Sequence, residues 1–271
     1  MKKIMALVLT ALTAVACCFA FTACNDKKYV AKEIASAEIE EYGYCISKTA
    51  SNHDAIMNAI NTVIDETDID KAVTYYTQYS SGETLTVTLD FPNLEDNTAG
   101  MLDIYTNSGF EPYEFIDKDG STIVGVDMYL MSLVAEKLNM KMTVHDIDFD
   151  TIVGVIKTKD NAIGAAGMTI NEERAESVDF SKPYFSSVQC IISEDGQAYT
   201  KISDLAGKKI GVQKGTTGWL MVDNAIKTGE LKDSGATLIE YENGGLAFTA
   251  MKQGKCDVVV IDKLPAQKLV K

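Results

Sequence analysis

Three places in the chain carry groups suited to holding a small charged molecule. Arg174 follows a predicted turn, and its planar guanidinium can bind a carboxylate through two parallel hydrogen bonds. Asp262 follows the apolar run 258–261 and either pairs with a cation or only caps the next helix. The segment 215–217 opens a predicted helix after a strand, where free backbone N–H groups attract anions. These residues predict the binding of charged groups.

Motifs for metal, nucleotide or hydrolytic chemistry do not fit the sequence. The only histidines are His53 and His145, which leaves little for a histidine-based centre, and no Ser–His–Asp set can be placed. Neither the Gly-x-Gly-x-x-Gly pattern nor a P-loop lysine pattern occurs. Three alternating aspartates begin at Asp146, but Thr151 and Lys157 stand where a calcium loop needs glycine and glutamate. We expect no catalytic residue, no metal site and no cofactor.

The composition is that of an acidic globular protein. The chain has 271 residues, of which 46% are hydrophobic and 24% are charged, and its formal net charge is −14. This length suits one two-lobed unit or two small domains. The negative charge argues against nucleic acid or an acidic membrane surface as a partner.

The first 24 residues have the pattern of a lipoprotein signal peptide. Two lysines precede the apolar run 4–21, and small residues come directly before Cys24, after which the chain turns polar. A simple signal peptide or an uncleaved anchor helix are the alternatives. A second apolar stretch long enough to span a bilayer is absent. We expect an extracytoplasmic protein, at the cell surface or in the periplasm, that is anchored to the bacterial membrane by lipid on Cys24.

Three further cysteines lie in apolar, strand-like runs. Cys45, Cys190 and Cys256 are an odd number and show no metal-ligand spacing. They are predicted to be buried free thiols.

Strands and helices alternate from Leu102 onward, which indicates an α/β fold with mainly parallel sheets. Strands are expected at 102–106, 142–144, 162–166, 188–192, 208–212, 237–241 and 257–261, and helices at 127–138, 151–157, 219–227 and 246–252. Asn171 is a predicted helix N-cap. Before residue 100, we predict a short strand over 42–47, a helix capped near Asn52, a second helix to Tyr79, and a linker that could form a strand.

Three groups of motifs share their order and spacing with a known family. They are Phe110–Phe115 with 124–127, Ala166–Arg174 with 178–185, and Asp204–Thr217 with the run that ends at Asp262. Together they resemble the polar amino-acid-binding proteins of ABC importers, solute-binding protein family 3, over residues 102–271. The resemblance implies a two-lobed periplasmic-binding-protein-like type II fold with a two-strand hinge. It also implies a receptor, not an enzyme, that captures an amino acid between its lobes and delivers it to an ABC transporter.

The same resemblance implies which residues hold the ligand. Arg174 and Thr169 would bind the carboxylate, while the Gly167 carbonyl and Asp262 would hold the ammonium group. The other residues that we expect around the ligand are Phe110 and Phe149, which would enclose its side chain, and Asn107, Gln213 and Thr217. Asn107 stands where several relatives have an aspartate for a cationic or amide side chain, which favours a polar neutral amino acid.

The order of the elements predicts a circular permutation. Residues 41–48 resemble a crossover segment that the family carries after the position matching the end of this chain, and 80–100 would join the family's usual termini. Lobe 1 would then comprise 42–79 and 101–189, and lobe 2 would comprise 25–41 and 190–271. A truncated chain with an unrelated N-terminal helical insert is the alternative.

Two other functions stay open at this point. One is a cleft enzyme on the same fold, of the cyclic-acid dehydratase type, which would need an acid–base group in the cleft. The other is a ligand-sensing module without transport. The expected partners are one small amino acid and the ABC permease subunits, without nucleic acid, and the receptor is expected to be a monomer.

Overall fold

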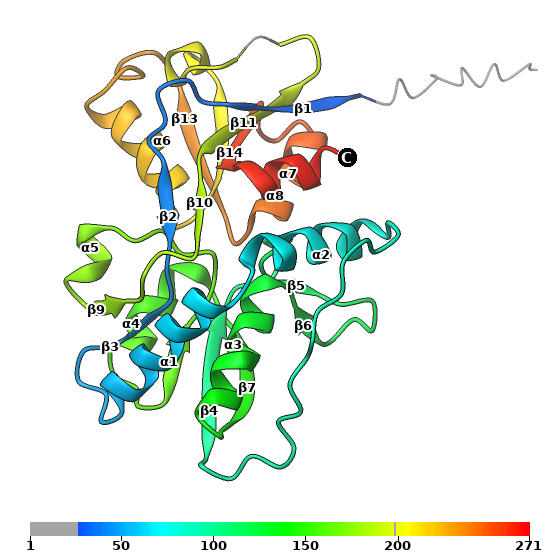
Figure 1. Ribbon diagram of the computed structural model, residues 1–271. Coiled ribbons are helices and arrows are strands. Elements are labelled where there is room, and N and C mark those ends of the chain that lie inside the picture. Colours follow the sequence, from blue (N-terminus) through cyan, green and yellow to red (C-terminus); the bar gives the residue numbers. More distant parts are fainter. Residues whose placement is uncertain (1–26, 198) are drawn as a thin grey trace, which may run out of the picture.

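The computed structural model describes residues 27–197 and 199–271, which form two lobes joined by a pair of strands (Figure 1). The predicted signal peptide and Cys24 lie outside these residues. Within the described ranges, none of the helices combines the length and the apolar character needed to cross a membrane.

The first lobe is built on a five-stranded sheet in the order β7-β4-β8-β3-β9. Its strands are β3 (Cys45–Ser47), β4 (Met101–Thr106), β7 (Lys141–Asp146), β8 (Ala162–Gly164) and β9 (Val178–Phe180). Helices α1 (His53–Glu66) and α2 (Ile69–Ser81) pack against α3 (Val126–Lys137), while α4 (Ile152–Ile156) packs on β8. The apolar side chains of α1 recur at helical spacing, as predicted, so one face of this helix is buried.

The second lobe repeats this plan with the order β1-β11-β14-β12-β13. Its strands are β1 (Tyr29–Glu33), β11 (Gln189–Glu194), β12 (Lys209–Gln213), β13 (Thr237–Tyr241) and β14 (Val258–Asp262). Its helices are α6 (Thr217–Lys227), α7 (Gly244–Lys252) and α8 (Lys263–Leu269). The shorter elements of the two lobes are β5 (Phe115–Ile116), β6 (Ile123–Val124), η1 (Phe149–Thr151), α5 (Glu172–Ala175) and η2 (Ile202–Leu205).

The hinge consists of β2 (Glu40–Tyr42) and β10 (Phe185–Ser187), which pair antiparallel between the lobes (Figure 1). Each hinge strand continues into a sheet strand of the lobe that it enters, β2 into β3 and β10 into β11. The crossover predicted at 42–47 is therefore divided between β2 and β3, whereas the one predicted at 188–192 lies on sheet strand β11, directly after hinge strand β10.

Both sheets are mixed, with two parallel and two antiparallel pairings each, where mainly parallel sheets were predicted. The reason lies in the hinge. The chain enters β3 from the second lobe and β11 from the first. Strand β3 therefore runs antiparallel to its neighbour β8, and β11 runs antiparallel to its neighbour β14.

The predicted strand in the linker is wrong. Residues 83–100 form no strand, and α2 ends at Gly82, which adopts a left-handed conformation with φ 68°. Phe91 packs on the rings of Tyr75 in α2 and Tyr129 in α3. The apolar residues of the segment therefore hold it across helices, where its backbone has no strand edge to pair with.

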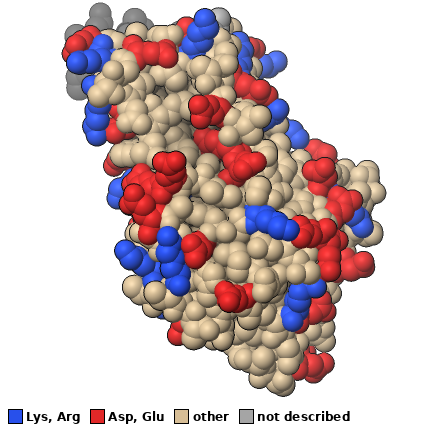
Figure 2. Space-filling view, turned by 60° about the vertical axis from the view of Figure 1, so that its left-hand side comes forward, with Lys and Arg blue, Asp and Glu red and all other residues tan. Residues whose placement is uncertain are grey.

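The prediction of buried free thiols is confirmed for Cys45, Cys190 and Cys256. Burial raises the pKa of Cys45 and of Cys190 to about 12, so neither thiol is reactive at neutral pH. On the molecular face drawn in Figure 2, acidic side chains are spread over both lobes with basic ones between them, in keeping with the net charge of −14.

Candidate binding site

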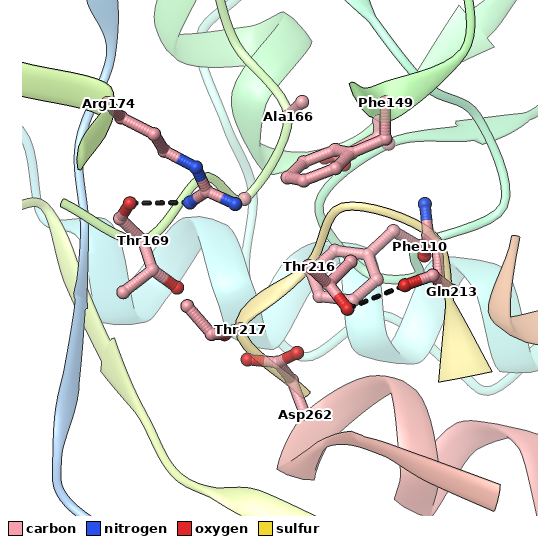
Figure 3. A pocket seen from close by; sticks show the side chains of 11 residues that line it. Phe110, Phe149, Ala166, Thr169, Arg174, Gln213, Thr216, Thr217 and Asp262 are labelled. Atoms are coloured by element: carbon pink, nitrogen blue, oxygen red, sulfur yellow. Dashed lines mark hydrogen bonds between the residues drawn. The ribbon is translucent and has the colours of Figure 1, made fainter. Parts of the chain in front are cut away.

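A cavity lies between the lobes. From the first lobe it is lined by Phe110, Glu114, Phe149, Ala166, Gly167, Thr169 and Arg174, and from the second by Gln213, Thr216, Thr217 and Asp262 (Figure 3). All the predicted ligand-binding residues except Asn107 are in this lining. The structure thus brings together side chains that are up to 152 positions apart, from Phe110 to Asp262 (262 − 110).

Arg174 reaches the cavity from α5, and the residue is only 9% exposed. The predicted N-cap Asn171 fixes the start of this short helix by accepting a hydrogen bond from the Arg174 backbone N–H at 2.9 Å. The guanidinium donates to the Thr169 carbonyl at 2.6 Å and, across the cleft, to the Gly215 carbonyl at 3.0 Å. Its carbon lies 5.2 Å from the ring centre of Phe149. Arg174 therefore contacts both lobes.

Asp262 ends β14 and faces the cavity from the opposite lobe. It occupies the N-cap position of α8 but makes no side-chain capping bond, so the alternative of a purely structural cap does not describe it. Instead, its Oδ1 accepts a hydrogen bond of 2.5 Å from the Tyr42 hydroxyl. Burial, followed by the nearby charge of Glu40, raises the pKa of Asp262 to about 7.

The start of α6 lies at the same cavity, which Thr216 and Thr217 line. Thr216 caps the helix by accepting from the Trp219 N–H at 3.1 Å, and its hydroxyl donates to the Gln213 carbonyl at 2.8 Å (Figure 3). Gly215 has φ 75°, and a Cβ atom there would lie 2.6 Å from Cβ of Asp150. Only glycine lets the loop before α6 approach the first lobe this closely.

Phe110 and Phe149 line the cavity and are each 8% exposed. Gly167 lies under Phe110 with φ 52°, and a Cβ atom at this position would be 2.5 Å from the ring. The aromatic ring and the backbone turn thus fit together only because residue 167 has no side chain.

Asn107 does not line the cavity. Its amide donates to the Ile147 carbonyl at 2.9 Å and accepts from the side chain of Gln213 at 2.9 Å. The second contact joins the two lobes, as does the ion pair of 2.7 Å between Lys214 and Asp150. Asn107 and Gln213, both predicted to bind the ligand, therefore bond to each other at the edge of the cavity.

Two buried acids near the cavity were not predicted as site residues, although both stand in the family motifs. Glu114 lines the cavity and is 1% exposed; burial, followed by the charge of Asp127, raises its pKa well above the ordinary range. Burial raises the pKa of Asp127 to about 6. Asp127 accepts from the Gly167 N–H at 2.9 Å and from the Tyr44 hydroxyl at 3.2 Å, so it fixes the turn that holds Gly167.

Glu40 on hinge strand β2 was also missed. One of its carboxylate oxygens accepts from the hydroxyls of Thr169 at 2.9 Å and Thr217 at 2.7 Å, and the Gln189 amide donates to both oxygens at 3.3 Å. The only available signal was its place directly before the crossover motif.

The chain is similar to solute-binding proteins of bacteria. The profile of the bacterial extracellular solute-binding proteins, family 3, matches residues 102–241. The arginine-binding extracellular protein ArtP of Bacillus subtilis is 34% identical over 111 residues, which are 41% of this chain and 43% of ArtP. A probable histidine-binding protein of Campylobacter jejuni is 30% identical over 170 residues, which are 62% of each chain. The matched region thus spans between 43% and 62% of the length of these two relatives.

Solved structures of the same kind share the fold. An ancestral arginine-binding protein bound to arginine has 37% sequence identity and a TM-score of 0.56, over 63% of this chain and 74% of that chain. The ancestral amino acid-binding protein AncCDT-1, a precursor of cyclohexadienyl dehydratase, has 30% identity and a TM-score of 0.52, over 60% of this chain and 70% of that chain. These similarities confirm the predicted two-lobed type II periplasmic-binding fold.

Proposed function

Because this chain belongs to the bacterial extracellular solute-binding proteins of family 3, we propose that it is an extracytoplasmic receptor that captures one amino acid between its lobes and delivers it to an ABC transporter. One observation carries this proposal. A buried guanidinium and a buried carboxylate, Arg174 and Asp262, face a single cavity from opposite lobes.

The arrangement matches the charges of an α-amino acid. The ligand carboxylate would take hydrogen bonds from Arg174 and from the N–H groups at the start of α6, and the ammonium would meet Asp262 and the Gly167 carbonyl. Each enclosed charge then has a partner, without which its burial would cost several kcal/mol. The ligand side chain would lie between Phe110 and Phe149.

Capture follows from the division of the site between two lobes. A ligand that touches both lobes binds the closed form better than the open form, and only this difference in affinity can shift the population toward closure. The hinge strands β2 and β10 would absorb the movement.

For the ligand itself we propose a polar neutral amino acid, because residue 107 is an uncharged asparagine where the family resemblance implies an aspartate in several relatives. Relatives named for arginine and histidine make these two amino acids the main competitors. Calorimetric titration with the twenty amino acids, cystine and ornithine tests both whether the protein binds an amino acid and which amino acid it prefers. No binding at millimolar concentrations would refute the receptor function.

The role of Arg174 can be tested against a matched cation. Arg174→Ala should weaken binding by at least about a hundredfold, because it leaves the ligand carboxylate enclosed without a partner. Lys182→Ala, which removes an exposed lysine paired with Asp65 elsewhere on the first lobe, should leave the dissociation constant within about twofold. Equal effects of the two substitutions would argue against the site.

Attachment and delivery are separate parts of the proposal. Lipid on Cys24 would hold the receptor at the membrane, so Cys24→Ser should release it from the membrane fraction without changing its affinity. Uptake of the labelled amino acid by cells should require both the receptor and its permease. Binding without uptake would support the sensing module instead.

We also propose that the chain is circularly permuted relative to its family. The first described strand, β1, lies in the second-lobe sheet beside β11, and β3 lies in the first-lobe sheet beside β8 and β9. Helix α8 packs against β1, so a short linker from 271 to 27 can close the chain there. A variant closed in this way and opened within 83–100 should fold and bind the same ligand with similar affinity; loss of folding would favour the N-terminal insert.

A cleft enzyme is the second candidate, and Glu114 is the observation that favours it. This acid lines the cavity, and burial raises its pKa well above the ordinary range, which favours the protonated form that a general acid needs. The assay is dehydration of a cyclohexadienyl acid, followed by the absorbance of the aromatic product. Turnover that Glu114→Gln abolishes would establish the enzyme.

A further inference from the structure

Glu40 stands at the point where the hinge meets the cavity. It belongs to β2, and its carboxylate oxygen Oε2 accepts one hydrogen bond from the first lobe, from Thr169, and one from the second lobe, from Thr217. The donor–acceptor distances are 2.9 Å and 2.7 Å. Both threonines line the cavity (Figure 3). A single oxygen atom therefore ties the lobes together beside the place proposed for the ligand.

A hydroxyl group has one hydrogen to donate. Because Thr169 and Thr217 both give theirs to Glu40, only lone pairs of these two oxygens remain for the cavity. Thr217 uses one of its own to accept from the Gln189 amide at 3.4 Å. Lone pairs cannot bind a carboxylate, but they can accept from an ammonium group. The expected role of Thr169 as a donor to the ligand carboxylate is therefore the reverse of what this arrangement offers.

The surroundings of Glu40 are rich in acceptors. Gln189 is fully buried and turns its amide N–H toward Glu40, and its Oε1 has no hydrogen-bond partner among the described residues. Asp262 faces the same end of the cavity, while Arg174 is the one cation among the lining residues of the described chain. The carboxylates of Glu40 and Asp262 outnumber the single guanidinium of Arg174. This end of the cavity therefore has few hydrogen-bond donors and little positive charge.

We propose that Glu40 is a positioning residue for the ligand ammonium group: it orients the hydroxyls of Thr169 and Thr217 as acceptors and holds the two lobes closed at this end. The inference deepens the proposed amino acid receptor and rests on it. It adds a residue from the hinge to a site otherwise built at the ends of sheet strands.

The test compares Glu40→Gln with Glu41→Gln in the full chain. Both substitutions remove one negative charge from β2, but Glu41 is exposed and its side chain makes no hydrogen bond in the described structure. For the amino acid that the wild-type protein binds, calorimetry should show at least about tenfold weaker binding in Glu40→Gln and no more than about twofold weaker binding in Glu41→Gln. The loss should be smaller for the des-amino analogue, which keeps the carboxylate and lacks the ammonium group, because only the contribution of Glu40 to lobe closure then remains.

The opposite sign would overturn the inference. If the hydroxyls are needed as donors to the ligand carboxylate, Glu40→Gln frees them and binding becomes tighter. The double variant of Glu40→Gln with Thr217→Val should be no weaker than the worse single variant, because both act through one contact. If the binding losses of the two single variants simply add in the double variant, that result would also count against the role proposed for Glu40.

A second measurement separates this inference from the proposed function. Fluorescent labels on the two lobes should report a larger mean separation in Glu40→Gln than in the wild type or in Glu41→Gln, before any ligand is added. If the wild type binds no amino acid, the receptor function fails and the label separation alone decides the role of Glu40. An unchanged separation would then refute it.

Discussion

Amino acid binding should weaken as the pH falls from 7 to 5, because Asp262 takes up a proton in this range. The carboxylate is buried, and burial together with the charge of Glu40 raises its pKa to about 7. A neutral Asp262 cannot pair with the ligand ammonium. Binding therefore requires loss of this proton, and each pH unit below the pKa adds to the cost of removing it.

The size of the effect follows from the pKa. At pH 7 about half of the molecules carry the ionised carboxylate, and at pH 5 only about 1% do, so the dissociation constant should rise about fiftyfold between pH 7 and pH 5. This corresponds to about 2.3 kcal/mol of binding free energy. Asp127, with a pKa of about 6, adds a smaller effect at the lower end because it fixes the Gly167 turn.

Stability should change with pH in the opposite direction. The folded protein keeps the Asp262 proton up to about pH 7, whereas an unfolded chain loses it near the ordinary value of 3.8. The folded state thus binds more protons between these values, so the free energy of unfolding falls as the pH rises through this window. The contribution of Asp262 is at most about 4 kcal/mol. Ligand-free protein should melt at a higher temperature at pH 5 than at pH 7.

The assay is calorimetric titration at four pH values from 5 to 8, in buffers with different ionisation enthalpies so that the protons released on binding are counted. Near pH 6 we expect release of close to one proton per ligand, since bound Asp262 is ionised. Asp262→Asn should bind weakly at every pH and show no such release. A dissociation constant that is flat from pH 5 to pH 8, or an equal slope in Asp262→Asn, would refute the reasoning.

Three further predictions concern residues around the cavity. Arg174→Lys keeps the charge but loses the bidentate geometry, so calorimetry should show binding about tenfold to a hundredfold weaker; an unchanged dissociation constant would exclude a two-bond contact. Gly167→Ala places a Cβ at φ 52°, 2.5 Å from the Phe110 ring, and should lower the unfolding free energy by about 1–3 kcal/mol while weakening binding; the result to look for in denaturant titration is this loss, and a neutral outcome would mean that the ring moves freely. Lys214→Ala breaks an exposed ion pair with Asp150 across the cleft, so its effect on affinity should stay within about threefold and shrink in high salt; a large, salt-independent loss would assign Lys214 to the binding site itself.

Much of the cavity could be predicted because its residues follow strands. Gly167 and Thr169 come after β8, Gln213 ends β12 and Asp262 ends β14. Open α/β sheets bind ligands at the carboxyl ends of their parallel strands, and both sheets of this protein direct those ends toward the cleft. A residue type with the right chemistry at the end of a predicted strand was therefore a sound candidate.

The remaining features depend on contacts that no local pattern encodes. Glu40 meets Thr169 and Thr217, which lie 129 and 177 positions away, and these contacts form only because the hinge crosses between the lobes. Asn107 also follows a strand, but its amide turns to Gln213, 106 positions away, and not into the cavity. Strand-end position alone did not indicate this direction.

Contacts between the lobes differ in what they contribute to ligand recognition. A bond that is equally strong with and without ligand, such as the ion pair between Lys214 and Asp150, stabilises the closed form by the same amount in both cases. Its loss should weaken the binding of every ligand by one common factor. The hydroxyls held by Glu40 face the ligand ammonium in our proposal, so a change at Glu40 alters affinity by an amount that depends on whether the ligand carries that group. The ratio of affinities for an amino acid and its des-amino analogue therefore separates contacts that close the cleft from contacts that recognise its occupant.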